Sequence, residues 1–237
     1  MKNWQEDLLD IMQHNTTCEN DIFKRIQDVA NTLEFQYVAY GFQALLPLSK
    51  PKVILLNNYP QFWKDRYAQA GYIQIDPTII HGRRSQEPIL WTDQVFAEAP
   101  NLWNEARAHG LKVGWAQSSL DGLGAGGMLT LARSCQCLTR RELDAKQLKM
   151  RWLVQVTHFT ISRLLRRNSI TGAPALSDRE LEILKWSADG KSAQDIADIL
   201  KLSKSTVDFH IKNCIVKMKV PNKTAAVVSA ALLGLLN

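Results

Sequence analysis

The sequence of 237 residues predicts an α+β protein: an N-terminal α/β/α sandwich with an antiparallel sheet, then a C-terminal all-α helix-turn-helix domain. Hairpin-like pairs of strands with helices before and after them indicate an antiparallel sheet covered on both faces. Near the C-terminus, amphipathic segments separated by very short breaks indicate a small helical domain. Between the two lies a polar stretch with glycine and proline, which is typical of a linker. We therefore expect domains at 1–165 and 176–237, joined by a linker at 166–175.

The elements of the N-terminal domain follow from capping signals, turn residues and apolar alternation. Thr16 and Glu19 have the spacing of a capping box, and an amphipathic helix follows them. A second box, Thr139 and Glu142, opens a long helix that is expected to end near Leu165. Further helices are expected from 58, from 76 and at 100–109, and strands at 36–42, 52–57, 89–91, 111–119 and 127–133.

A glycine motif lies between the last two expected strands. Gly122, Gly124 and Gly127 have the GxGxxG spacing of a dinucleotide-binding loop. That motif requires a helix to open at its last glycine, so that the helix N-terminus meets the pyrophosphate. Here a strand-like run follows, and no helix is expected before Thr139. We therefore interpret the motif as a hairpin loop.

The last sixty residues carry three capped amphipathic segments in succession. Ser177 and Glu180 form a capping box, and Gly190 stands where a left-handed stop is needed. Ser192 and Ser203 cap the next two helices, and the apolar run 225–236 is expected to belong to a final helix. A helix, a turn of about three residues and a second helix form the unit that places its second helix in the DNA major groove.

The polar face of the third helix indicates a nucleic-acid partner. Six lysines and one acid fall between Lys201 and Lys223. Lysines can neutralise phosphates, whereas Asp208, Lys212 and Asn213 can reach base edges. A solvated helix face is the plainer interpretation, but the short turn and the two caps favour double-stranded DNA. The candidate DNA-binding residues are Lys204, Ser205, Thr206, Asp208, His210, Lys212 and Asn213.

Composition sets the class of protein and its compartment. The formal charge of +6 and a pI near 9.2 agree with a polyanionic partner. The four cysteines have no metal-like spacing and are expected as free thiols in a reducing cytosol. The start of the chain lacks the apolar region of a secretory signal, and the longest apolar run is too short to cross a bilayer. We expect a cytoplasmic protein with no membrane partner, no metal and no cofactor.

The N-terminal domain is rich in aromatic residues that also carry a polar group. Such residues suit a ligand cavity because they combine apolar faces with a directional donor. Core packing is the plainer interpretation, and we keep it for Trp103 and Trp115. Asp76 also has a plainer role, as the N-cap of the helix that begins at Pro77.

One pattern of residues runs through the whole chain. It comprises Tyr59-Pro60-x-x-Trp63-x-x-x-Tyr67, Asp76-Pro77, Trp91 and Gly114, and then Glu180, Leu184 and Gly190. In these positions the sequence resembles the LuxR-type quorum-sensing transcriptional regulators. The resemblance implies an acyl-homoserine lactone in the N-terminal, autoinducer-binding domain. It also implies a homodimer on an inverted-repeat promoter site, with RNA polymerase as a candidate partner.

The resemblance further implies a contact for each polar atom of the lactone. Trp63 would donate to the ring carbonyl, and Asp76 would accept from the amide N–H. Tyr59, with Thr130, would donate to the amide carbonyl, while Trp91 would pack on the ring. The candidate ligand-binding residues are Tyr59, Trp63, Tyr67, Asp76, Trp91 and Thr130.

Two other classes of function were weighed against this one. A regulator driven by phosphorylation needs an acidic pocket at the ends of parallel strands, which the first sixty residues do not offer. An enzyme needs a catalytic grouping, whereas the histidines are scattered, so we expect no enzymatic activity. A helix-turn-helix regulator that responds to a different small molecule, or that acts without a cognate synthase, stays open as the alternative.

Overall fold

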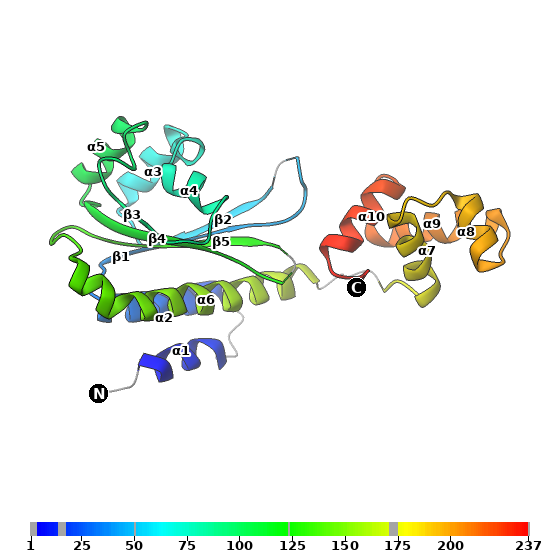
Figure 1. The fold of residues 1–237 in the computed structure, drawn as a ribbon, viewed down its shortest axis with the longest axis horizontal. Coiled ribbons are helices and arrows are strands. Elements are labelled where there is room, and N and C mark those ends of the chain that lie inside the picture. The colour runs from blue at the N-terminus through cyan, green and yellow to red at the C-terminus, as the bar shows by residue number, and fades with distance from the viewer. Residues whose placement is uncertain (1–3, 14–17, 50, 123, 171–174, 237) are drawn as a thin grey trace. The chain divides into compact units, whose positions relative to one another are not determined.

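A five-stranded antiparallel sheet forms the middle layer of the N-terminal unit, Met1–Arg166 (Figure 1). The computed structural model describes residues 4–13, 18–49, 51–122, 124–170 and 175–236, with the backbone alone for 166–170. The strand order is β2-β1-β5-β4-β3. The strands are β1 (Tyr37–Gln43), β2 (Val53–Asn57), β3 (Ile89–Leu90), β4 (Val113–Leu120) and β5 (Gly126–Arg133).

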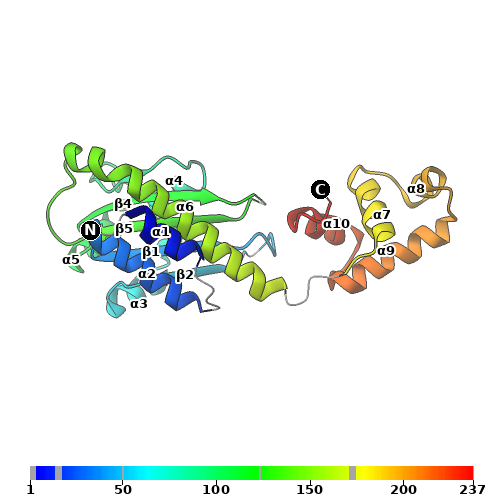
Figure 2. The same cartoon turned by 90° about the horizontal axis from the view of Figure 1, so that it is seen from below.

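Helices cover both faces of this sheet, as the sequence predicts. On one face lie α2 (Glu19–Thr32) and α6 (Arg140–Ile170), with α1 (Trp4–Gln13) beneath them (Figures 1 and 2). The other face carries α3 (Gln61–Gln69), a 3-10 turn (Tyr72–Gln74), α4 (Pro77–Gly82) and α5 (Pro100–Ala108).

Each face of the sheet has its own apolar core. Tyr40, Leu129 and Leu131 pack with Trp115 between the sheet and α2 and α6. Trp103 belongs to the second core, on the side of α3 and α5, where its Nε1 donates to Asp93 at 2.6 Å. Both tryptophans that were expected in the core are therefore buried there.

Gly122 and Gly124 of the glycine motif lie in the connection between β4 and β5, which the structure describes apart from residue 123, and Gly127 lies in β5. The two strands pair antiparallel from Leu120 and Gly126 onward. The next helix begins only at Arg140. The hairpin interpretation is therefore confirmed, because no helix opens at the last glycine of the motif.

The boundaries predicted for α2 and α6 are wrong, and the final helix ends at Leu232, before the end of the apolar run 225–236. The long helix α6 does not end near Leu165 but continues to Ile170, into the predicted linker. No proline or glycine lies between Leu165 and Gly172, and the polar residues after Leu165 can continue a helix without an apolar stripe. The helix α2 begins at Glu19 with Cys18 as its N-cap and no side-chain cap, so Glu19 is not the third residue of a capping box. Thr16 lies outside the described residues.

The capping box predicted at the start of α6 forms only in half. Thr139 Oγ1 accepts from Glu142 N at 3.2 Å. The Glu142 carboxylate turns away from the helix end to Arg133, with two oxygen–nitrogen distances of 2.8 Å, and to Lys146. These cations bring the pKa of Glu142 down to about 2, because their hydrogen bonds outweigh the effect of burial.

The C-terminal unit, Arg167–Asn237, is all helical in its described part. No helix in the described residues is long and apolar enough to span a membrane. The four cysteines are free thiols. The helices are α7 (Asp178–Ala188), α8 (Ala193–Leu200), α9 (Lys204–Met218) and α10 (Lys223–Leu232).

Candidate functional site

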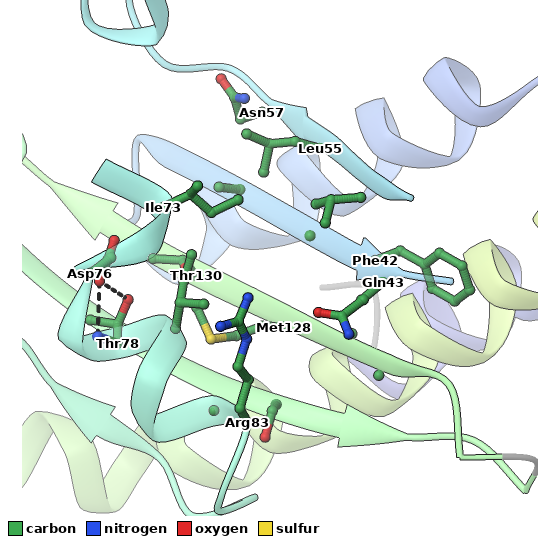
Figure 3. A pocket seen from close by; sticks show the side chains of 18 of the residues that line it. Phe42, Gln43, Leu55, Asn57, Ile73, Asp76, Thr78, Arg83, Met128 and Thr130 are labelled. Carbon is green, nitrogen blue, oxygen red and sulfur yellow. Dashed lines mark hydrogen bonds between the residues drawn. The ribbon is translucent and has the colours of Figure 1, made fainter. Parts of the chain in front are cut away.

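A cavity of about 640 Å³ lies on the face of the sheet that carries α3 and α4. It is lined mainly by apolar side chains, with polar groups concentrated toward α4 (Figure 3). The structure brings all six candidate ligand-binding residues to this one cavity, although they come from α3, α4, β5 and two loops. They are Tyr59, Trp63, Tyr67, Asp76, Trp91 and Thr130.

The helix α3 places two of these aromatics side by side. Trp63 and Tyr67 are four residues apart and therefore share a helix face. Their rings meet edge to face with centroids 5.8 Å apart, and Trp63 is 3% exposed. Lys64 also lines the cavity, one residue after Trp63.

Asp76 is both a helix cap and a cavity residue. Its Oδ1 accepts from Thr78 N at 2.8 Å and from Thr78 Oγ1 at 2.6 Å, which caps α4 (Figure 3). Its Oδ2 accepts from the Tyr67 hydroxyl at 2.9 Å. The predicted cap is confirmed, and the same carboxylate lies at the cavity wall.

Burial shifts the pKa values of the polar groups around Asp76. It raises the pKa of Asp76, and the hydrogen bonds from Thr78 and Tyr67, which favour the carboxylate, offset only part of the effect. Burial and the nearby Asp76 carboxylate also raise the pKa of Tyr59 and of Tyr67. Both phenols therefore stay protonated and can act as hydrogen-bond donors.

Trp91 is held against the sheet by the absence of a side chain at position 114. Trp91 N donates to Gly114 O at 2.9 Å, and a Cβ built on Gly114 would lie 2.1 Å from Trp91 Cδ2. Any other residue at Gly114 would displace the indole, which explains this glycine in the sequence pattern. The buried Trp91 Nε1 has no hydrogen-bond partner among the described residues.

Sequence reasoning missed the part of the cavity that the sheet provides. Gly41 and Gln43 on β1, Leu55 on β2 and Met128 on β5 all line it. Alternation along β5 could have connected Met128 with Thr130, because residues two apart share a face. The residues of β1 and β2 could not have been found in this way, because they depend on the register between strands.

The second candidate site is the exposed face of α9. Lys204, Ser205 and Lys212 are exposed there, and Thr206, Asp208 and Asn213 are partly exposed. His210 differs from the other candidates: its Nδ1 is buried and has no hydrogen-bond partner within the described part of the chain. Sequence reasoning missed Phe209, which is 59% exposed on this helix. An exposed phenylalanine can contact a thymine methyl group.

A cap and an ion pair to a buried carboxylate hold α9 in place. Three residues separate it from α8, and Lys201 adopts a left-handed conformation, with φ of 53°, in that turn. Ser203 Oγ accepts from Thr206 N at 3.1 Å, which caps the helix. Near its C-terminus, Lys217 Nζ donates to the buried Glu180 carboxylate of α7 at 2.7 Å. Burial raises the pKa of Glu180, but this bond and one from Ser177 outweigh it and hold the pKa below its usual range.

Comparison with known proteins assigns both units. Residues 19–161 match the family described as "Autoinducer binding domain", and residues 174–230 match "Bacterial regulatory proteins, luxR family". "Transcriptional activator protein AnoR" of Acinetobacter nosocomialis is 42% identical, over 100% of both chains. "HTH-type quorum-sensing regulator RhlR" of Pseudomonas aeruginosa is 37% identical, over 91% of this chain and 89% of that protein.

Solved structures agree with these assignments. A crystal structure of SdiA of Escherichia coli superposes with a TM-score of 0.87 at 35% identity, covering 99% of this chain and 98% of that chain. A second SdiA structure, in complex with octanoyl-rac-glycerol, gives a TM-score of 0.84 at 35% identity, over 99% of this chain and 95% of that one. The relatives are transcriptional regulators rather than enzymes. The chain therefore belongs to the LuxR family of quorum-sensing transcriptional regulators, with an autoinducer-binding domain followed by a DNA-binding helix-turn-helix domain.

Proposed function

We propose that this regulator binds an acyl-homoserine lactone in the cavity and, as a homodimer, an inverted-repeat promoter site. The observation that carries the ligand is the grouping of donors and one buried carboxylate beside an apolar cavity. Asp76, Tyr59 and Trp63 supply an acceptor, a phenol donor and an indole donor in one wall. An acyl-homoserine lactone presents an amide, a ring carbonyl and an apolar chain, which is the complementary set of groups.

Each polar atom of the lactone then has a partner. Asp76 Oδ1 serves the helix cap, whereas Oδ2 accepts from Tyr67 and can accept a second bond from the ligand amide. Tyr59 and Thr130 donate to the amide carbonyl, and Trp63 donates to the ring carbonyl. Trp91 packs against the ring. Pairing matters because a buried polar group left without a partner costs about 1–3 kcal/mol.

A different single-chain amphiphile is the alternative ligand. The SdiA structure with octanoyl-rac-glycerol favours it, because that ligand joins a polar head to an acyl chain. The same cavity wall could hold such a head. Both ligand classes predict binding through the apolar cavity, and they differ only at the polar end.

The dimer is proposed from an apolar stripe on α6. Leu148, Trp152 and Phe159 share one helix face and are 59%, 52% and 47% exposed. Exposed apolar side chains that gather in a patch mark interaction sites. A two-fold dimer places two copies of α9 on half-sites about one helical turn of DNA apart. We place the action of this dimer in the cytoplasm, on promoters where RNA polymerase is its partner.

The melting temperature of the purified full chain tests the ligand. A ligand that binds only the folded state stabilises it by about 2.7 kcal/mol at a hundred times its dissociation constant. We expect a panel of acyl-homoserine lactones to raise the melting temperature, while free fatty acids of equal length do not. A rise with 1-monoacylglycerols alone would support the alternative ligand. No rise with either series would overturn the ligand assignment, whereas the assignment of the DNA-binding domain would be unaffected.

A further inference from the structure

Three successive rungs of the sheet form the floor of the cavity. A rung here is a row of three residues paired across β2, β1 and β5. Their residues are two positions apart on each strand and so share one face. All nine line the cavity. The rungs are Asn57, Ala39 and Thr130; then Leu55, Gly41 and Met128; then Val53, Gln43 and Gly126.

The floor extends well beyond Asp76. Asp76 lies near the Thr130 end, and Gln43 lies at the other end (Figure 3). From Thr130 to Gly126, β5 advances by four residues, which is ~13 Å at about 3.3 Å per residue. An extended hydrocarbon chain advances by about 1.25 Å per carbon–carbon bond, so a chain needs at least about eleven carbons to span this distance.

Glycines leave the path over the floor open. A Cβ on Gly41 would meet Leu55 Cδ1 at 3.9 Å, and one on Gly126 would meet Leu120 Cδ2 at 3.6 Å, both ordinary contacts. Neither glycine has a positive φ. Neither backbone geometry nor a close contact therefore requires glycine at these two positions, in contrast to Gly114, where a Cβ would lie against Trp91. The missing side chains instead leave room above the second and third rungs.

The far end of the cavity ends among exposed apolar side chains. Leu48, Val53, Leu55 and Leu120 all line the cavity. Their exposed fractions are 64%, 43%, 51% and 53%. A chain that reaches the third rung covers apolar surface on these residues, whereas a chain of four carbons does not reach them. Removal of that surface from water favours the longer chain.

We infer that this regulator selects ligands with acyl chains of about eleven carbons or more, from the ~13 Å floor, and that Gly41 is a specificity-determining residue for chain length. The inference rests on the proposed function, because the chain is positioned by the polar head at Asp76. A side chain at position 41 would occupy the space above the second rung through which the acyl chain passes. It would block long chains and leave the space for short chains nearer the head.

Chain-length series on the purified full chain test the inference. Each fully buried methylene tightens binding by about fourfold, and methylenes that stay partly exposed contribute less. We therefore expect a twelve-carbon lactone, with eight more methylenes, to bind at least ~100-fold more tightly than a four-carbon lactone. In Gly41→Val we expect about tenfold or greater loss for ten- and twelve-carbon lactones, since at least two methylenes are displaced. Four-carbon binding should be nearly unchanged, which also shows that the variant folds.

A matched substitution and a second route complete the experiment. Gly122→Val is the control, because a Cβ there has nothing within 4 Å and Gly122 does not line the cavity. If Gly41→Val fails to fold, the pair Leu48→Ser and Val53→Thr tests the same path at exposed positions. That pair should also weaken long-chain binding selectively and leave four-carbon binding unchanged.

The outcomes separate this inference from the proposed function. Lactones that bind with an optimum at four to six carbons would overturn the inference and support the ligand class. Equal losses of affinity for all chain lengths, in Gly41→Val or in the pair Leu48→Ser and Val53→Thr, would also overturn the inference and support the ligand class. If lactones do not bind but Gly41→Val selectively weakens the binding of long-chain 1-monoacylglycerols, the chain-length inference stands and the head-group assignment is wrong. Failure of both series would overturn both.

Discussion

At the scale of single residues, Asp76 combines a helix cap with a proposed ligand-binding role in one carboxylate. One oxygen caps α4 through Thr78, and the other is held by Tyr67. The cap fixes the carboxylate before any ligand arrives, so little side-chain entropy is lost on binding. The phenol of Tyr67 in turn is oriented by the acid, which couples two of the residues that line the cavity.

Asp76→Asn should separate the two roles. Asn caps helices nearly as well as Asp, so the melting temperature without ligand should change little. A charge-assisted hydrogen bond is roughly twice as strong as a neutral one, so the half-maximal lactone dose should rise about tenfold or more. A reporter dose–response beside a melting curve measures both. An unchanged dose with a large loss of ligand-free stability would reduce Asp76 to a cap.

The same substitution carries a pH signature. Burial raises the pKa of Asp76 in the folded protein, so its protonated form contributes stability that is lost as the pH rises through that raised pKa. A ligand amide N–H favours the carboxylate, and protons therefore compete with the ligand. Lactone affinity should fall as the pH is lowered through the raised pKa, and Asp76→Asn should flatten this dependence. Parallel pH profiles for both proteins would contradict the assignment.

The polar wall of the cavity could be predicted from the sequence, whereas its floor could not. Trp63 and Tyr67 show their common face by helical spacing alone, and Asp76 precedes a proline that opens a helix. Gly41 carries no such signal, because its neighbours Leu55 and Met128 are set by strand pairing. For the same reason the inference about acyl chain length rests on the structure and not on the residue pattern.

At the scale of elements, helix starts were easier to predict than helix ends. Ser177 and Ser192 each form both halves of a capping box, because the box is complete within four residues of sequence. The end of α6 at Ile170 has no comparable local signal: it precedes Gly172, and several polar residues before it can join the helix. The start of α2 was misplaced because Cys18 takes the cap position without a side-chain bond.

Two lysines of α9 should behave differently on DNA. Lys212 lies in the middle of the exposed face, and we expect Lys212→Ala to cost about 1–3 kcal/mol on the specific site and much less on random DNA. Lys204 is at the first turn, where a phosphate contact is expected. Lys204→Ala should therefore weaken both kinds of binding alike and reduce the salt slope by about one. Binding titrations at several salt concentrations measure this. Equal losses on both DNAs for Lys212→Ala would make it a phosphate contact too.

At the scale of the whole molecule, the helix α6 serves two surfaces. Its inner side, with Met150 and Leu153, packs in the core against the sheet. Its outer side carries Trp152 and Phe159, which are about half exposed. The proposed dimer therefore rests on a helix whose position is fixed by the same sheet that lines the ligand cavity.

Trp152→Glu should turn the dimer into a monomer. A charge in the middle of an apolar interface loses its hydration without gaining a partner. Light scattering should report the monomer mass, and affinity for an inverted repeat should fall far more than affinity for one half-site. Phe62→Glu is the control, because Phe62 is 72% exposed on α3 and does not belong to the stripe. A dimer that persists in Trp152→Glu would place the interface elsewhere.

The alternation along β5 has a consequence for how such regulators diverge. Met128 and Thr130 line the cavity, while Leu129 and Leu131 belong to the core beneath. Substitutions at the first pair can retune ligand preference without disturbing the second, so new signals can be acquired one replacement at a time. Insertion or loss of a single residue would exchange the two sets and place leucines where the ligand binds. We expect lineages of this fold to change their signals by substitution and to keep the length of β5 constant.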